Sequence, residues 1–513
     1  MTTLSSLFFA AASAAPDKTA LSCEGETLSY AALAQRAARL SHGLAEAGVR
    51  TGDHIGVLLP NSADAVALML AAADIGAAIV PLNPTAPPDA VARAFAAADV
   101  AHVVAEPQAA RALQAGADAV PSGVFAVAGE DPLPTGAISL AALIAAAPAD
   151  AQPRDAADPD APYILTATSG STGAPKPIVL SQTTKIARAR AAAELYGVTA
   201  ADRVLAATPL HHSLAQRLVL LPLILGATAI VMARYSPSAW IRAVESEGVS
   251  FTIAVSSQLA GILEALENDA TAETKRCPSL RCIVSSSALL ETAVKEKLRT
   301  RLSCDLHECY GASEIAIATN LDARRPDAPL ASVGAPAPGV EVRILDETGA
   351  PLPPGETGEI AARTPMAFVG YHKQPELTAA AHADGFFKTG DLGFLDEAGW
   401  LYFRGRKKEL IITGGANVYP SDVEAAVEDL AGVAECAAFA LPDERLGEAV
   451  ALAVVRAEGT QISARDIRLA CADRLADEQQ PRKIFFINTL PRNAMGKLIR
   501  RELPGLVEST SMT

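Results

Sequence analysis

Hydrophobic and polar positions alternate in two rhythms through about residue 310 of the chain. Short apolar runs typical of buried strands recur as RVLAAT (203–208), ATAIVMA (227–233), SFTIAVS (250–256) and RCIVSSS (281–287). Between such runs lie Ala- and Leu-rich stretches with helical spacing, for example LAQRAARLSHGLAEA (33–47). This alternation predicts βαβ units, and hence an α/β fold in which helices cover mostly parallel sheets. Ligands of such sheets bind at the carboxyl ends of the strands.

The rhythm changes between residues 330 and 403. VEVRIL (340–345) and EIAAR (359–363) read as short strands, and the segment between them is rich in Gly and Pro. Such spacing is typical of antiparallel strands joined by turns. We therefore predict a small antiparallel β unit over 330–403.

The last hundred or so residues return to a mixed pattern. A helical pattern in SDVEAAVEDL (421–430) precedes a strand pattern in AECAAFAL (434–441), and a second helix is expected near 463–477. The charged run Arg404 to Glu409 is the candidate linker. We predict a large N-terminal domain over 1–404, which includes the β unit, and a smaller α+β domain over 405–513.

Composition narrows the class of protein. The chain has 513 residues, half of them hydrophobic, which is more than one core normally serves. A net charge of −15 without a Lys/Arg-rich stripe argues against nucleic acid as a partner. The apolar, uncharged run Leu218 to Ala233 is interrupted by Pro222 and Gly226 and is too short to span a bilayer. We therefore expect a protein that acts on small molecules and is not an integral membrane protein.

Cysteine usage and the N-terminus bear on the compartment. Seven cysteines lack CxxC pairs and suggest neither a zinc site nor a disulfide framework, so a reducing, cytoplasmic setting is expected. The opening MTTLSSLFFAAASAAPDK has an apolar centre but no basic residue before it, unlike a signal peptide. We predict that it forms the first helix.

The most suggestive loop follows the apolar run YILTAT (163–168) and reads SGSTGAPKP. It fails the Walker pattern because Pro175 precedes Lys176 and Pro177 follows it. Its hydroxyls, glycines and lysine are nevertheless the groups that hold phosphate oxygens. Taken alone, the loop fits a flexible linker about as well as a phosphate clamp.

Further segments decide between these readings. ECYGASE (308–314), FFKTGD (386–391), GRKKELIITGGANVYPSDVE (405–424) and PRNAMGK (491–497) follow the loop in order. Together they resemble the core motifs of the adenylate-forming superfamily of acyl-CoA synthetases, nonribosomal-peptide adenylation domains and luciferases. The resemblance covers nearly the whole chain.

The resemblance implies a reaction and the substrates it needs. A carboxylate would attack the α-phosphate of ATP, release pyrophosphate, and then pass as an acyl group from AMP to coenzyme A. A carboxylic acid is already ionised at neutral pH, so the obstacle is repulsion between anions, which positioned cations and Mg²⁺ lower. The implied cofactors are ATP, Mg²⁺ and coenzyme A.

The same resemblance implies site residues. Those expected to bind ATP or coenzyme A are Thr168, Ser169, Gly170, Ser171, Thr172, Gly173, Lys176, Ser287, Ala288, Tyr310, Gly311, Ala312, Ser313, Asp391, Arg406, Gly414, Gly415 and Lys497. Those expected to contact the acid are His212, Ser213, Ser286 and Cys309. The catalytic set would be Lys176, His212, Glu314 and Lys497, with Glu314 binding Mg²⁺.

Roles within that set also follow from the resemblance. Tyr310 would stack on adenine, Asp391 would accept hydrogen bonds from the ribose, and Lys497 would bridge the carboxylate and the α-phosphate. Lys408 would be the hinge of a mobile C-terminal domain, because Lys497 is needed only for adenylation. Gly414 and Gly415 would line the path of the thiol, although a GG pair is also an ordinary turn.

Several positions depart from the family pattern. Pro177 replaces a glycine, Ser286 to Leu289 replace a Gly-Gly-Ala-Pro type segment, and Cys309 replaces a glycine beside the acyl channel. Arg217 reads as a helix-surface residue, with a second polar group of the substrate as the other possibility.

We therefore predict a carboxylate–CoA ligase of fatty or aromatic acid metabolism. Two rivals stay open: an acyl-AMP ligase that loads a carrier-protein thiol, and a non-catalytic nucleotide-binding relative.

Overall fold

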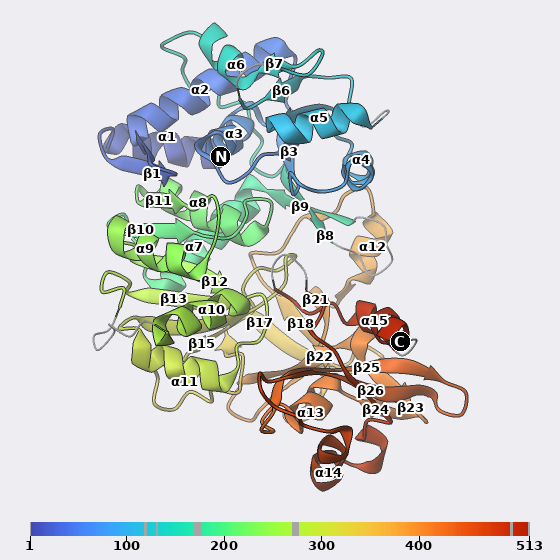
Figure 1. Cartoon of the computed structure of the whole chain (residues 1–513). Coiled ribbons are helices and arrows are strands. Elements are labelled where there is room, and N and C mark those ends of the chain that lie inside the picture. Colours follow the sequence, from blue (N-terminus) through green and yellow to red (C-terminus); the bar gives the residue numbers. More distant parts are fainter. Residues whose placement is uncertain are drawn as a thin grey trace.

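The computed structural model of the chain describes residues 2–116, 121–129, 132–168, 176–268, 276–492 and 496–510. These described residues form four sheets, and Figure 1 shows the N-terminal elements in blue and green above the orange and red C-terminal ones. The predicted α/β class is confirmed. No helix among the described residues is long and apolar enough to cross a membrane.

The largest sheet is parallel in its centre and antiparallel at its edges. Its strands, in spatial order, are β16 (Ala335–Pro336), β15 (Thr319–Asp322), β14 (Asp305–Tyr310), β13 (Cys282–Ser286), β12 (Phe251–Val255), β10 (Arg203–Ala206), β11 (Thr228–Val231), β1 (Thr19–Cys23) and β2 (Glu26–Ser29). The apolar runs of the sequence are thus its central strands. Their carboxyl ends lie at one edge because parallel strands run the same way.

A second sheet repeats this design. In spatial order it consists of β19 (Gly370–Tyr371), β9 (Lys176–Ser181), β8 (Pro162–Thr168), β4 (Ala78–Pro81), β3 (His54–Leu58), β5 (His102–Ala105), β6 (Phe125–Val127) and β7 (Ile138–Ser139). β8 and β9 are antiparallel and carry the two ends of the loop SGSTGAPKP.

Helices cover both sheets and share their core. They are α1 (Leu4–Ala14), α2 (Tyr30–Ala47), α3 (Ala63–Ile75), α4 (Pro88–Ala97), α5 (Pro107–Ala115), α6 (Leu140–Ala146), α7 (Gln182–Tyr196), α8 (Ser213–Leu225), α9 (Pro237–Glu247), α10 (Ser256–Glu267) and α11 (Thr292–Arg301). One apolar cluster takes in Ile55 and Val204 from the two sheets with Leu68 of α3 and Leu221 of α8. The two sheets therefore stabilise one another through common helices.

The first helix forms where the sequence predicts it. Thr3 and Ser6 make a reciprocal capping box at the start of α1. Leu4, Phe8 and Ala12 then recur at four-residue spacing on its buried face. The opening segment is thus part of the core.

A third sheet forms the predicted antiparallel unit. It contains β17 (Glu341–Leu345), β18 (Gly358–Arg363), β21 (Phe386–Leu395), β20 (His382–Ala383) and β22 (Leu401–Arg406), with α12 (Pro375–Ala380) nearby in the chain. The charged run expected to be a linker begins inside this sheet, because Arg406 pairs with Asp391 across β22 and β21. The rest of the run forms the 3-10 turn η1 (Lys407–Glu409), which follows the last strand of this sheet.

The C-terminal sheet has its own core. Its strands are β24 (Ala416–Val418), β23 (Ile411–Thr413), β26 (Gly447–Arg456), β25 (Val433–Asp443) and β27 (Lys483–Phe486). They are accompanied by α13 (Pro420–Ala425), α14 (Ala464–Arg474), η2 (Asp477–Gln479), η3 (Arg500–Glu502) and α15 (Leu503–Thr510). The helix expected over 421–430 ends at Ala425 and continues as turns. The boundary near residue 404 stays a prediction.

Candidate functional site

Predicted binding residues gather at the carboxyl ends of two neighbouring strands. β13 ends at Ser286 and β14 ends at Tyr310, and Ser285 pairs with Glu308 between them. Ser287 and Ala288 follow β13, while Cys309 lies buried in β14. Ser287 has a φ of 77°, which a non-glycine residue rarely adopts. The sheet therefore brings the predicted adenine wall and the predicted stacking tyrosine together.

Asp391 lies at the centre of a polar cluster that joins two sheets. Its Oδ2 accepts a 2.9 Å hydrogen bond from the Tyr310 hydroxyl, which also lies 3.1 Å from the Thr389 hydroxyl. Arg406 Nε is 3.4 Å from the other carboxylate oxygen of Asp391. Burial raises the pKa of Asp391, and the Arg406 charge opposes that shift. The sequence did not single out Thr389.

Lys497 reaches this cluster from the segment between β27 and η3. Burial, and next the Arg406 charge, lower its pKa to about 8, although Asp391 and Glu409 act in the opposite direction. Lys408 also repels it, and burial lowers the pKa of Lys408 as well. Lys497 thus lies among the groups that the resemblance assigns to nucleotide binding.

The loop that carries Lys497 packs closely against the first turn of α10. A Cβ atom on Gly496 would meet the Ser257 hydroxyl oxygen at 2.2 Å. Gly496 also has a φ of 73°, so no other residue fits this contact without strain. Ser257 belongs to the first turn of α10.

A cavity of about 450 Å³ opens beside that contact. Its walls follow the carboxyl ends of β10, β11 and β12 and end at Gly496. The lining residues include Thr208, Tyr235 and Gln258. This is the edge at which parallel sheets are expected to bind ligands.

Glu314 lies in a tight turn after Gly311. A Cβ atom on Gly311 would lie 1.7 Å from the Ala316 carbonyl oxygen, so the turn requires glycine. Glu314 Oε1 accepts a 3.0 Å hydrogen bond from the Tyr371 hydroxyl, and burial raises the pKa of its carboxyl. A buried carboxylate oxygen suits a hard cation such as Mg²⁺, which often takes one protein carboxylate together with substrate phosphates. The residues of this turn therefore fit the expected ion.

The candidate phosphate loop lies partly outside the described residues, which exclude Ser169, Gly170, Ser171, Thr172 and Gly173. Its two ends are described. The backbone of Thr168 pairs with that of Lys176, the first residue of β9.

Pro177 occupies the second position of β9. It pairs with Ala167, and its carbonyl accepts a 2.9 Å hydrogen bond from the His372 N–H. A proline is tolerated at the start of a strand because a missing N–H there costs little.

Gly414 and Gly415 form the two-residue turn between β23 and β24. Their φ angles are 58° and 86°, and two positive φ angles are what a tight hairpin of this type requires. The turn by itself explains both glycines. Their place on a thiol path stays a prediction.

The predicted acid-binding residues lie at the start of α8. His212 is the N-cap residue, its Nε2 has no hydrogen-bond partner among the described residues, and burial lowers its pKa. Ser213 is the first helical residue, and its hydroxyl lies 3.5 Å from Arg188 Nη1.

Two buried cations that the sequence did not single out come from α7. Arg188 donates at 2.9 Å to the Met366, Ser313 and Glu314 carbonyls and is 1% exposed. Lys185 donates to Gln216 Oε1 at 2.9 Å and is 3% exposed. Both lie on the buried face of α7 together with Ala192 and Tyr196. Their helical spacing from these apolar residues is the sequence signal that could have revealed their burial.

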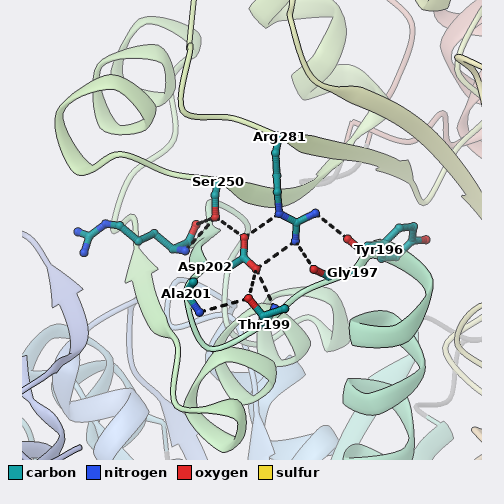
Figure 2. Close-up of polar contacts among 8 residues, drawn as sticks. Tyr196, Gly197, Thr199, Ala201, Asp202, Ser250 and Arg281 are labelled. Carbon is teal, nitrogen blue, oxygen red and sulfur yellow. Dashed lines mark hydrogen bonds and ion pairs between the residues drawn. The ribbon is translucent and has the colours of Figure 1, made fainter.

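A polar network fixes the end of α7 (Figure 2). Arg281 donates to the Tyr196 carbonyl at 2.7 Å and to the Gly197 carbonyl at 2.9 Å. Asp202 in turn pairs with Arg281 at 2.8 Å and accepts from Thr199 and Ser250. A cation at the carboxyl end of a helix is stabilising. The network therefore holds the backbone at the end of α7, and the Tyr196 ring points away from it in Figure 2.

Known proteins match the chain along nearly its whole length. Residues 8–372 match the AMP-binding enzyme family, and residues 422–497 match the AMP-binding enzyme C-terminal domain. An indoleacetate–CoA ligase of Aromatoleum aromaticum is 33% identical, with 96% of each chain covered. A sulfoacetate–CoA ligase of Cupriavidus necator is 32% identical, with 98% of this chain and 97% of the relative covered.

A solved structure agrees in fold. ATP-bound MatB from Rhodopseudomonas palustris is 28% identical and covers 99% of this chain and all of its own, with a TM-score of 0.89. The apo form of the same protein gives 0.77. The arrangement described above is thus more similar to the ATP-bound form. The chain belongs to the AMP-binding enzyme family, as its motifs predicted, and within it stands among the ATP-dependent acid–CoA ligases.

Proposed function

We propose that this chain activates a carboxylic acid as an acyl-adenylate and transfers the acyl group to coenzyme A. The observation that supports the proposal most directly is the convergence of Lys497, Asp391, Arg406 and Tyr310 on one buried cluster. These residues come from two sheets and from the C-terminal loop that carries Lys497. The charges of the cluster suit a ligand that carries both hydroxyls and phosphates.

In the first step, a carboxylate oxygen attacks the α-phosphorus and pyrophosphate leaves. Lys497 would lie between the two reacting anions and lower their repulsion, and the Asp391 carboxylate would hold the ribose hydroxyls. Lys176 would bind the pyrophosphate oxygens as they leave. Glu314 would hold Mg²⁺, which neutralises phosphate charge when bound.

In the second step, a thiol attacks the acyl carbonyl and AMP leaves. Lys497 would no longer be needed, and a turn of the C-terminal domain at Lys408 would remove it from the site. Gly414 and Gly415 would then line the entry of the thiol. The cluster around Lys497 represents the arrangement for the first step.

The decisive experiment separates the three candidate functions. Pyrophosphate release on addition of a carboxylic acid and ATP would exclude a pure nucleotide binder, which releases none. Formation of a thioester with free coenzyme A, compared with a holo carrier protein, would then identify the acceptor. If every acid that releases pyrophosphate fails to form a thioester with free coenzyme A, the proposal is overturned in favour of carrier loading.

The relatives do not identify which carboxylic acid this chain would activate. One is named for an aromatic acid and another for a sulfonated one, at nearly equal identity to this chain. The residues around the acyl side of the site must therefore supply the answer.

A further inference from the structure

Arg217 is a buried cation without a partner among the described residues. It lies in the second turn of α8 and is 8% exposed, and its Nε has no hydrogen-bond acceptor there. No hydrogen bond or ion pair from its guanidinium to any described residue is present. Leaving a buried charge unpaired is strongly unfavourable, so such a group calls for a functional explanation.

The surroundings of Arg217 supply positive charge and no compensating anion among the described residues. Burial lowers the pKa of the guanidinium, and the groups that act against this shift are only the Cys309 thiol and the Tyr196 phenol. Burial raises the pKa of both, so both are neutral near physiological pH. Lys185 lies close enough for Arg217 and Arg188 to lower its pKa further.

The carboxylate that acts in this region is already engaged elsewhere. Glu314 acts on Arg188 and accepts its hydrogen bond from Tyr371. It is not among the groups that shift the pKa of Arg217. Arg188 therefore has a carboxylate nearby and Lys185 donates to the Gln216 amide, whereas Arg217 has neither.

Arg217 lies on the acyl side of the site and apart from the nucleotide cluster. Its neighbour Cys309 directly precedes Tyr310 in β14, so the guanidinium is close to where the acid must lie. The charges that act on Lys497 are Arg406, Asp391, Glu409 and Lys408, which form a separate set. The reacting carboxylate and the α-phosphate thus have their own cations.

We propose that the acid activated by this chain carries a second oxyanion, a carboxylate or a sulfonate, which binds Arg217. This inference rests on the proposed function and names its substrate class. Arg217 would bind the second group by paired N–H donors, for which carboxylates and sulfonates both offer suitable oxygens. The Tyr196 ring, at the end of the helix whose backbone the network of Figure 2 holds, and Cys309 would form the adjoining wall.

The test compares acids that differ only in the second group. Straight-chain monocarboxylic acids, the dicarboxylic acids of equal length and the corresponding ω-sulfonates are assayed for pyrophosphate release and CoA thioester. We expect at least one dianionic acid to exceed its monoanionic counterpart by about 10- to 100-fold in kcat/KM, as for loss of a hydrogen bond to a charged group. The Arg217→Met variant should lose that advantage and keep or improve its rate on the monocarboxylic acid.

A second variant of Arg217 and the melting temperature of the first separate a role in binding from a structural role. Arg217→Lys keeps the charge and should retain part of the preference for the dianionic acid. Arg217→Met should unfold at the same or a higher temperature, by roughly 1 to 3 °C, because it removes an unpaired buried charge. The exposed Arg190, on the neighbouring α7, provides the control, and Arg190→Met should change neither the substrate preference nor the melting temperature.

Each contrary result has a distinct meaning. If monocarboxylic acids are preferred over every dianionic acid, or if Arg217→Met keeps the wild-type preference, this inference is wrong and the ligase function stands. If Arg217→Met melts well below the wild type, Arg217 is structural and the inference is also wrong. If no acid releases pyrophosphate, the proposed function itself fails.

Discussion

The nucleotide side and the acyl side of the candidate site treat their charges in opposite ways. On the nucleotide side, Asp391 accepts from Tyr310 and pairs with Arg406, and Lys407 pairs with Glu359 at 2.9 Å. On the acyl side, Arg217 has no partner among the described residues. The charges named on the nucleotide side thus have partners within the protein, whereas the charge of Arg217 on the acyl side has none among the described residues.

The difference reflects what each side must bind. The nucleotide is common to the whole family, so a preorganised cluster of paired charges serves every member. The acid varies between members, and a charge whose partner is the substrate gives specificity at the expense of stability. Substitutions should therefore cost activity and stability on the nucleotide side, and activity alone on the acyl side.

The largest effect is expected from Lys497→Ala. Because Lys497 would bridge the two reacting anions, adenylation should fall by about 100- to 1,000-fold, as for loss of a donor to a developing charge. Thioester formation from preformed acyl-adenylate should stay within about threefold, since this step would not use Lys497. Single-turnover assays of each half-reaction measure the two rates.

The exposed Lys483, on β27 of the C-terminal sheet, provides the control for Lys497→Ala. Lys483→Ala should leave both half-reactions unchanged. Equal loss of both half-reactions in a folded Lys497→Ala protein would contradict the separate roles assigned to the two steps.

Asp391→Asn should have the next largest effect and tests the paired side directly. The amide keeps the shape but removes the charge that faces Arg406 and would hold the ribose hydroxyls, so the Kd for ATP should rise by about 10- to 100-fold. Loss of a partner for the half-buried Arg406 should also lower stability by about 1–3 kcal/mol. Calorimetric ATP binding and denaturant unfolding measure these quantities. If Asp391→Asn and Arg217→Met shift stability in the same direction, the contrast between the two sides is wrong.

The sequence predicts the nucleotide side better than the acyl side, for a physical reason. Asp391, Arg406, Tyr310 and Lys497 belong to motifs whose residue types follow from phosphate and ribose chemistry. The strand rhythm alone also predicts a strand over 281–287 and ligands at the carboxyl ends of such strands. The roles of the motif residues in catalysis are still predictions, but their proximity is now a property of the fold.

The acyl side could not be predicted because the hydrophobic periodicity of a helix does not reveal which groups surround a buried charged side chain. Lys185 and Arg188 resemble solvated basic residues in the sequence, and the fold buries both. The sequence pattern favours a helix-surface position for Arg217, and this interpretation is wrong because α8 lies in the shared core. Burial from packing of α8 between two sheets is a tertiary effect that local spacing does not contain.

Lys408→Pro should have a smaller effect than either substitution above. Fixing the backbone at η1 should slow the thioester step by about tenfold and leave adenylation within about twofold, because only the second step requires rotation. Stopped assays with free coenzyme A measure the first quantity and pyrophosphate release the second. Equal loss in both steps would remove Lys408 from its role as the hinge.

The pH dependence of adenylation should show the smallest effect and tests the charge state of Lys497. Burial and Arg406 lower the pKa of this lysine to about 8, so the required ammonium form is present below that pH and lost above it. In the free enzyme, kcat/KM for ATP should therefore be about half its neutral value near pH 8 and continue to fall as the pH rises. Lys497→Arg keeps its charge at alkaline pH and should abolish this fall, whatever its absolute rate. A wild-type profile that stays flat to about pH 9.5 would show that the charge on Lys497 is not needed, or that its pKa is not lowered by the cluster.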